Sequence, residues 1–141
     1  MQAERLFTIE EANEMIPKLE AVMEQLQRHG FALREQLKEV AHSTDEPLDR
    51  ITTAQLLERR PQLRPVIAEI DRLVSEIEAC GGDLKGLDLG LVDFPAERDG
   101  EIILLCWQYG EKEITHYHTF EGGFTGRQPL DPRTVRAKYL Q

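Results

Sequence analysis

The chain has 141 residues, enough for one domain with a substantial core, and its 40% hydrophobic and 30% charged content is typical of a soluble globular protein. Its formal net charge of −9 argues against a general nucleic-acid or anionic-membrane binder, because phosphate contacts need a basic surface. No apolar run approaches the roughly 18 residues of a membrane span. Cys80 and Cys106 are too few for a disulfide scaffold. We therefore expect an acidic cytoplasmic protein with free thiols.

The first half of the chain has the pattern of a long helix. Thr8 and Glu11 have the spacing of a capping box, which predicts that the helix begins at Ile9 and runs to about residue 41, roughly 50 Å. Pro17 should kink it, because proline cannot donate to the carbonyl of Asn13. Apolar residues at alternating spacings of four and three predict a coiled-coil seam with a weak position at Gly30: Ala12, Ile16, Leu19, Met23, Leu26, Gly30, Leu33, Leu37 and Val40.

A second helical pattern follows a polar turn and ends at Gly81-Gly82. Pro61 or Pro65 marks its start, and Thr52 or Thr53 can cap a short helix before it. The helical spacing itself is carried by apolar residues that extend over only roughly 28 Å of helix: Leu63, Ile67, Ile70, Val74 and Ile77. The second helix therefore covers the first helix fully only if residues 53–60 are helical too. The uncovered seam predicts a homodimer, and the alternative is a hairpin within one chain.

From residue 91 onward the period changes to two, as in strands. Residues 91–98 and 101–108 flank Asp99-Gly100, a strong two-residue hairpin signal that places Asp93 opposite Cys106. A third strand is expected over residues 113–120. One face of the hairpin, the Phe94 face, carries Val92, Phe94, Ala96, Ile103, Leu105 and Trp107. The other, the Asp93 face, carries Leu91, Asp93, Pro95, Ile102, Leu104 and Cys106.

The register of the third strand decides where His116 and His118 point. A two-residue turn that begins with Gly110 puts both histidines on the Phe94 face. A three-residue loop that ends with Gly110 flips every side chain and puts them on the Asp93 face. We favour the first register because it needs no bulge.

Several short motifs are similar to those of a known family. They are FTIEEANEMIPKL near the start, GLVDFPA, LCWQYGE, a histidine at 118 and GFTGRQPL. In this order they resemble a small prokaryotic family of unknown function, domain number twenty-two-oh-three, over nearly the whole chain. The resemblance implies a shared fold but no activity. It also implies an aromatic residue where this chain has His116, which argues against a metal site that needs both histidines.

The same segment contains candidate metal ligands. His116 and His118 lie on one strand face, a spacing that many zinc and iron sites use. Such a divalent metal site needs a third ligand, for which Glu121 is the first choice and Glu113, Asp93 or Cys106 are alternatives. The structural interpretation is that the histidines are partly buried and hydrogen-bonded to neighbours.

A second hypothesis is a ligand site in which Asp93, His118 and Arg127 converge, with Trp107 or Phe124 as a wall. The glycine-rich segment before Arg127 can form a backbone cradle for a small anion. A buried Asp93 needs a partner, so the alternative is a structural pair with Arg127 or a backbone amide. Cys106 fits a core position better than a nucleophile, because the sequence offers it no nearby base.

These patterns predict a single α+β domain over residues 1–141. It comprises a long antiparallel helical hairpin (1–82), a three-stranded antiparallel β-meander with a glycine-rich loop (83–130) and a C-terminal helix (131–141). The preferred function is a dimeric binding or assembly module that recognises a small anionic ligand or a protein segment. The alternatives are a metal-dependent hydrolase-like enzyme that uses His118 with Asp93 or Glu121, and a structural coiled-coil adaptor.

Overall fold

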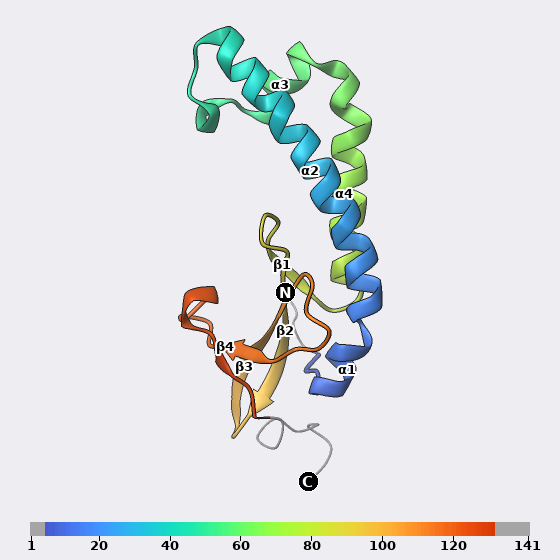
Figure 1. Ribbon diagram of the computed structural model, residues 1–141, viewed down its shortest axis with the longest axis vertical. Coiled ribbons are helices and arrows are strands. Elements are labelled where there is room, and N and C mark those ends of the chain that lie inside the picture. The colour runs from blue at the N-terminus through green and yellow to red at the C-terminus, as the bar shows by residue number, and fades with distance from the viewer. Residues whose placement is uncertain (1–4, 132–141) are drawn as a thin grey trace.

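The computed structural model describes residues 5–131 and is α+β, with helices first and an antiparallel sheet after them (Figure 1). Apart from Asp131, the predicted C-terminal helix lies outside the described residues. Within 5–131, none of the helices combines the length and apolarity that crossing a membrane requires. The helices are α1 (Ile9–Glu14), α2 (Ile16–Thr44), α3 (Thr53–Arg59) and α4 (Arg64–Ala79), with 3-10 turns at Leu48–Arg50, Pro61–Leu63 and Phe124–Gly126.

The first helical pattern begins as predicted and is interrupted near its proline. The Thr8 hydroxyl accepts from the Glu11 amide at 3.0 Å, and the Glu11 carboxylate accepts from the Thr8 amide at 2.9 Å. The helix then divides at Met15, so that Pro17 lies in the first turn of α2. A proline is tolerated there because the first-turn amides have no partner within a helix.

The return arm is divided into two helices, so the helices do not form the plain hairpin pair that was predicted, but the short helix that Thr52 was predicted to cap is present. Thr52 caps the separate helix α3, the 3-10 turn Pro61–Leu63 follows it, and only then does α4 run back along α2. Leu56 and Leu63 of this broken arm pack with Val40 near the end of α2. One chain therefore covers more of the long helix than the predicted second helix alone would, and the homodimer stays a prediction.

The sheet has five strands within the described residues, not the predicted three, in the order β1-β2-β3-β4-β5. They are β1 (Asp83–Gly86), β2 (Leu91–Arg98), β3 (Glu101–Gln108), β4 (His116–His118) and β5 (Gln128–Pro129). The two additional strands lie at the edges and are too short to show a two-residue period in the sequence. The Asp99-Gly100 turn is confirmed: φ is 52° and 83°, as a type I′ turn requires, and Asp93 lies opposite Cys106.

The favoured register of the third strand is wrong. Cys106 lies opposite His116, so both histidines of β4 belong to the Asp93 face. The connection runs from residue 109 to 115, much longer than a two-residue turn, and it is anchored. Trp107 Nε1 donates to the Glu111 carbonyl at 3.1 Å, and the Ile114 amide donates to Asn13 Oδ1 at 2.8 Å. These bonds shorten β4 to three residues and fix its register.

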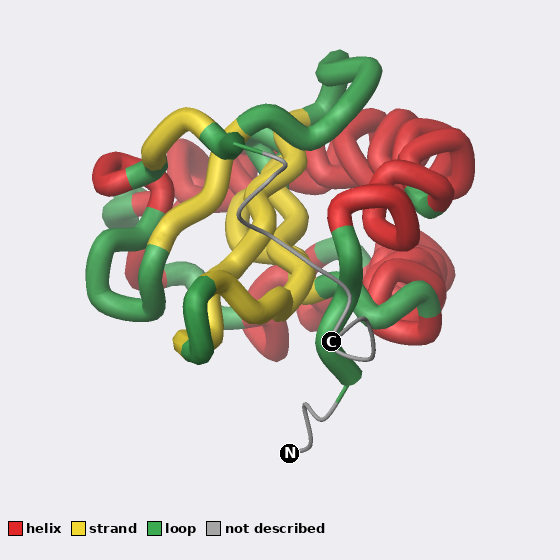
Figure 2. Tube along the Cα trace, turned by 90° about the horizontal axis from the view of Figure 1, so that it is seen from below, coloured by secondary structure: helices red, strands yellow, loops and turns green. Residues whose placement is uncertain are grey.

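The two faces of the sheet have different coverings. The Phe94 face packs against α1, α2 and α4 in the main core, where Phe94, Leu105 and Trp107 are fully buried. Residues 119–127 form a loop on the opposite side of the sheet from α1 and α2 (Figures 1 and 2). This loop therefore covers the Asp93 face, which points away from the helical core.

The core predicts the stability of variants on α2. Leu26 is completely buried in the main core, so we expect Leu26→Ala to lower the free energy of unfolding by about 2–5 kcal/mol. Phe31 lies on the same helix but is 68% exposed, so Phe31→Ala should change it by less than about 0.5 kcal/mol. Urea unfolding of both variants measures the difference, and equal effects would contradict this assignment of the core.

Candidate metal centre

Three neighbouring strands bring Asp93, Cys106 and His118 together on the Asp93 face. Asp93 of β2 lies directly opposite Cys106 of β3, and His118 of β4 lies opposite Leu104, two residues along the same strand. The exposed fractions are 1% for Asp93, 1% for Cys106 and 5% for His118. One carboxylate oxygen, the thiol sulfur and one ring nitrogen all lie within 4.8 Å of one another.

The ring of His118 is held at both nitrogens. Nδ1 lies 2.8 Å from the carbonyl oxygen of Thr119, and Nε2 lies 2.8 Å from Oδ2 of Asp93. A carbonyl can only accept, so Nδ1 carries a hydrogen and donates it. The contact between Nε2 and Oδ2 also needs a proton, which sits either on the imidazole or on the carboxyl group. The two residues therefore share one proton in this arrangement.

Asp93 is under-satisfied for a buried carboxyl group. Burial raises the pKa of Asp93, and His118 only partly offsets this by favouring the charged form. The weakly donating thiol of Cys106 also favours the carboxylate, yet Oδ1 has no partner that meets hydrogen-bond geometry among the described residues. A buried oxygen without a partner costs on the order of 1–3 kcal/mol, so it points to a missing binding partner.

Cys106 is a protonated thiol in this setting. Burial raises its pKa to about 12, and the neighbouring Asp93 carboxylate adds to the effect. Arg127 opposes the shift but does not cancel it. A thiol in this state is a poor nucleophile, whereas a bound cation of charge +2 deprotonates a coordinating thiol outright. The site therefore suits metal coordination better than nucleophilic catalysis.

The donor set fits zinc. One sulfur, one imidazole nitrogen and one carboxylate oxygen are ligand types that Zn²⁺ accepts, whereas Ca²⁺ and Mg²⁺ prefer oxygen alone. The Thr119 carbonyl supplies the outer contact that metal-binding histidines usually make, which fixes the tautomer and directs Nε2 toward the ligand. Oδ1 of Asp93 has no hydrogen-bond partner in this buried cluster, and it would gain a partner when an ion binds.

The structure separates the three predicted metal residues. His116 lies opposite Cys106, but its Nδ1 is 2.9 Å from the Thr115 hydroxyl and its ring is not part of the three-residue group. Glu121 is exposed in the loop after β4 and lies outside that group as well. Of the predicted metal set, only His118 joins Asp93 and Cys106.

The predicted ligand residues are divided as well. Trp107 is buried in the main core on the Phe94 face, away from Asp93. Arg127 lies 3.3 Å from the Glu111 carboxylate and 3.4 Å from the Gln108 side-chain oxygen, and its guanidinium stacks over Phe124 at 4.9 Å. Asp93 thus takes His118 as its hydrogen-bonded partner, while Arg127 pairs with Glu111.

Two contributors to the site were not predicted from the sequence. The Thr119 carbonyl is a backbone group and leaves no signal in a side-chain pattern. Glu111 was not among the predicted site residues, yet its side chain accepts from the Gln108 amide at 2.8 Å and pairs with Arg127. The signal that could have indicated its role is its position three residues after Gln108, within reach of that amide.

The chain was compared with known families, curated proteins and solved structures. No match was found among curated proteins or among solved structures. A family model described as "Uncharacterized conserved protein (DUF2203)" matches residues 5–130, which include both the helices and the whole sheet. The chain therefore belongs to the DUF2203 family.

Proposed function

We propose that this protein binds one divalent metal ion of the zinc type through Asp93 Oδ1, Cys106 Sγ and His118 Nε2. The observation that carries the proposal is the unpartnered, fully buried Asp93 Oδ1 inside a cluster of three ligand types. The carbonyl of Thr119 supports it further, because it holds the proton of His118 on Nδ1. Coordination would replace the shared proton and deprotonate the thiol.

The number of protein ligands bears on what the ion does. Three protein ligands and one further position are typical of catalytic zinc sites, whereas structural sites usually have four protein ligands. The burial of all three residues favours binding or stabilisation, since a substrate would have to reach the fourth position. A hydrolase-like activity based on His118 and Asp93 is therefore the second candidate, and its support is the ligand count alone.

Recognition of a small anion or a protein segment at the loop after β4 has less support. Arg127 would be the anion's partner, but Glu111 already neutralises it, and Gln108 accepts a hydrogen bond from it. A homodimer and a coiled-coil adaptor role are proposals that rest on the apolar seam of α2, most of which packs within one chain. Neither of them explains the cluster on the Asp93 face.

Titration of the metal-free protein with Co²⁺ tests the metal proposal. We expect one ion per chain, an absorption band from thiolate-to-cobalt charge transfer, and a rise in melting temperature with Zn²⁺ because a ligand of the native state stabilises it. Cys106→Ser should abolish the band and weaken Zn²⁺ binding by at least about tenfold.

The matched control is Cys80→Ser, which removes the second free thiol at the end of α4. This variant should keep both the band and the melting shift. A band that survives in Cys106→Ser but disappears in Cys80→Ser would place the ion elsewhere. Absence of any binding by the unmodified protein would refute the proposal.

A further inference from the structure

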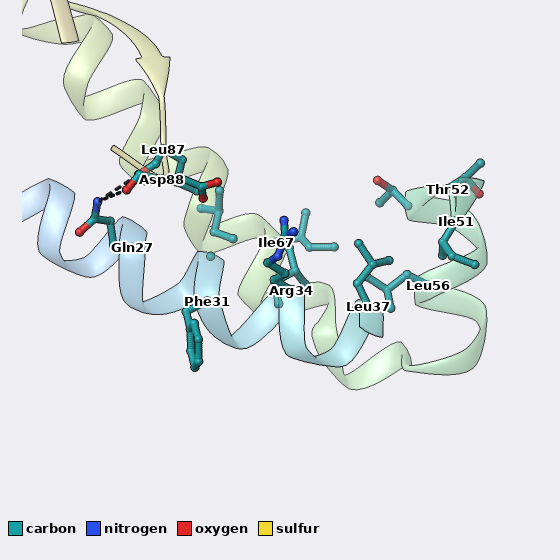
Figure 3. A pocket seen from close by; sticks show the side chains of 14 residues that line it. Gln27, Phe31, Arg34, Leu37, Ile51, Thr52, Leu56, Ile67, Leu87 and Asp88 are labelled. Carbon is teal, nitrogen blue, oxygen red and sulfur yellow. Dashed lines mark hydrogen bonds between the residues drawn. The ribbon is translucent and has the colours of Figure 1, made fainter. Parts of the chain in front are cut away.

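A cavity of about 640 Å³ lies along the helical arm, and none of the residues that line it belongs to the metal cluster. It is open to solvent on one side and is lined by α2, α3, α4 and the turn between β1 and β2 (Figure 3). Its lining residues come from two apolar regions: Ile70 and Leu87 pack against the main core, and Leu56 belongs to the distal cluster of Val40, Leu56 and Leu63. Its volume is within the range of small-molecule sites, roughly 300–1,000 Å³.

The walls of the cavity are mainly aliphatic. Most of them are formed by side chains that belong to or pack against the main core or the distal cluster and also line the cavity: Leu33, Leu37, Ile51, Leu56, Ile70 and Leu87. Ile67 also lines the cavity and belongs to neither cluster. At the near end, Gln27 Nε2 donates to the carbonyls of Leu87 and Asp88 at 3.0 and 3.2 Å, which holds the β1–β2 turn against α2.

Two charged side chains line the cavity. Figure 3 shows Arg34 extending from α2 toward the cavity, whereas Phe31 points away from it. Within residues 5–131, Arg34 has no ion pair, in contrast to Lys38 one turn later, which pairs with Glu35. Asp88 lies on the β1–β2 turn and contributes a carboxylate. Because the charges of Arg34 and Asp88 sum to zero, a dianion would bring more uncompensated negative charge into the cavity than a monoanion, so the cavity favours a monoanion.

We propose that this cavity binds an amphipathic monoanion: an unbranched alkyl chain lies between the aliphatic walls, and its carboxylate pairs with Arg34. The walls supply the affinity, since each buried methylene contributes about 0.8 kcal/mol. Arg34 supplies the preference for a carboxylate, because a guanidinium binds it through two parallel hydrogen bonds. The proposal does not depend on the metal centre.

Calorimetric titration with dodecanoate, kept below the concentration at which it aggregates, tests the proposal. We expect saturable binding of one molecule per chain and weaker binding of dodecyl phosphate, which carries a second charge. Arg34→Gln should weaken the binding of dodecanoate by at least about tenfold, which is the usual effect of losing a hydrogen bond to a charged group. It should leave the affinity for dodecanol unchanged. Arg59→Gln, which removes an exposed cation that does not line the cavity, should change neither.

A cavity-filling variant separates this site from adventitious surface binding. Ile67→Trp should abolish binding of both dodecanoate and dodecanol, and Thr53→Trp at the cavity rim serves if the first variant fails to fold. Dodecanoate binding that is unaffected by Arg34→Gln and by either filling variant would overturn the proposal. Sedimentation gives the competing outcome: a dimer that Ile67→Trp dissociates would assign the cavity to a second copy of the chain.

Discussion

Replacing His118 by leucine is expected to lower the free energy of unfolding of the metal-free protein by about 3–5 kcal/mol at neutral pH. His118 is the only hydrogen-bonded partner of Asp93 Oδ2 among the described residues, and both side chains are buried. Leucine fills similar space but leaves the carboxyl group in an apolar setting without a partner. Urea unfolding in the presence of a chelator measures the change.

The double variant Asp93→Leu/His118→Leu provides the matched control. When both members of a buried pair become apolar, the penalty for an isolated charge disappears, so we expect a smaller loss than for His118→Leu alone. His42→Leu, at an exposed position near the end of α2, should change the stability by less than about 0.5 kcal/mol. Additive losses in the double variant would show that the two side chains do not interact.

The loss in His118→Leu should also depend on pH. Burial raises the pKa of Asp93 above its ordinary value of 3.8, and His118 opposes that rise. Without His118 the pKa should rise further. A raised folded pKa means that the folded state binds the proton more tightly, so this stabilisation is complete below the unfolded pKa and is lost as pH rises through the folded one. The variant should therefore approach the unmodified protein in acid and fall behind it toward neutral pH.

Local signals in the sequence were sufficient for much of the fold. The Thr8–Glu11 capping box and the Asp99-Gly100 turn each depend on residues within one or two turns of chain, and both are confirmed. Near Pro17 the helix is divided at Met15 and not merely kinked as predicted. The two-residue turn also fixed the pairing of Asp93 with Cys106, because a hairpin's register follows from its turn. Half of the candidate site could thus be placed from the sequence.

The other half depends on contacts between distant parts of the chain. The position of β4 is set by the hydrogen bond from Ile114 to Asn13, which are 101 residues apart, and by the loop that Trp107 and Glu111 hold. No local pattern encodes that anchor, so a short turn was the simpler hypothesis. Since one residue of register moves His118 to the other face, the site could not be completed before the structure was known.

The partner of Asp93 shows the same limit. Arg127 was a reasonable candidate, because a guanidinium after a flexible glycine-rich segment can reach many carboxylates. In the structure a nearer carboxylate, Glu111, lies on the anchored 109–115 loop and takes Arg127. Asp93 is then left with the imidazole that the register of β4 brings to it. The apolar strand around Asp93 indicated that its carboxylate needs a partner, but the choice between Arg127 and His118 depended on tertiary structure.

Zinc affinity is expected to rise with pH, by about one log unit per pH unit between about pH 6 and pH 8 from the thiol of Cys106 alone, and by more at any pH where Asp93 and His118 still hold their shared proton. One proton leaves Cys106, whose pKa of about 12 keeps the thiol protonated throughout this range until the metal binds. The other is the proton that Asp93 and His118 share, because the ion needs the lone pair of Nε2. Competition with a chromophoric chelator of known pH dependence gives the affinity at each pH.

Cys106→Ser tests how these protons are divided. A serine hydroxyl gives up its proton far less readily than a cysteine thiol does. The zinc affinity that remains in this variant should therefore rise by about one log unit less per pH unit than that of the unmodified protein. Cys80→Ser should keep the full slope, since Cys80 lies outside the cluster. An affinity that hardly changes with pH would mean that the ion meets an already deprotonated site. That result would contradict both the protonated thiol and the shared proton, and with them the assignment of the ion to Asp93, Cys106 and His118.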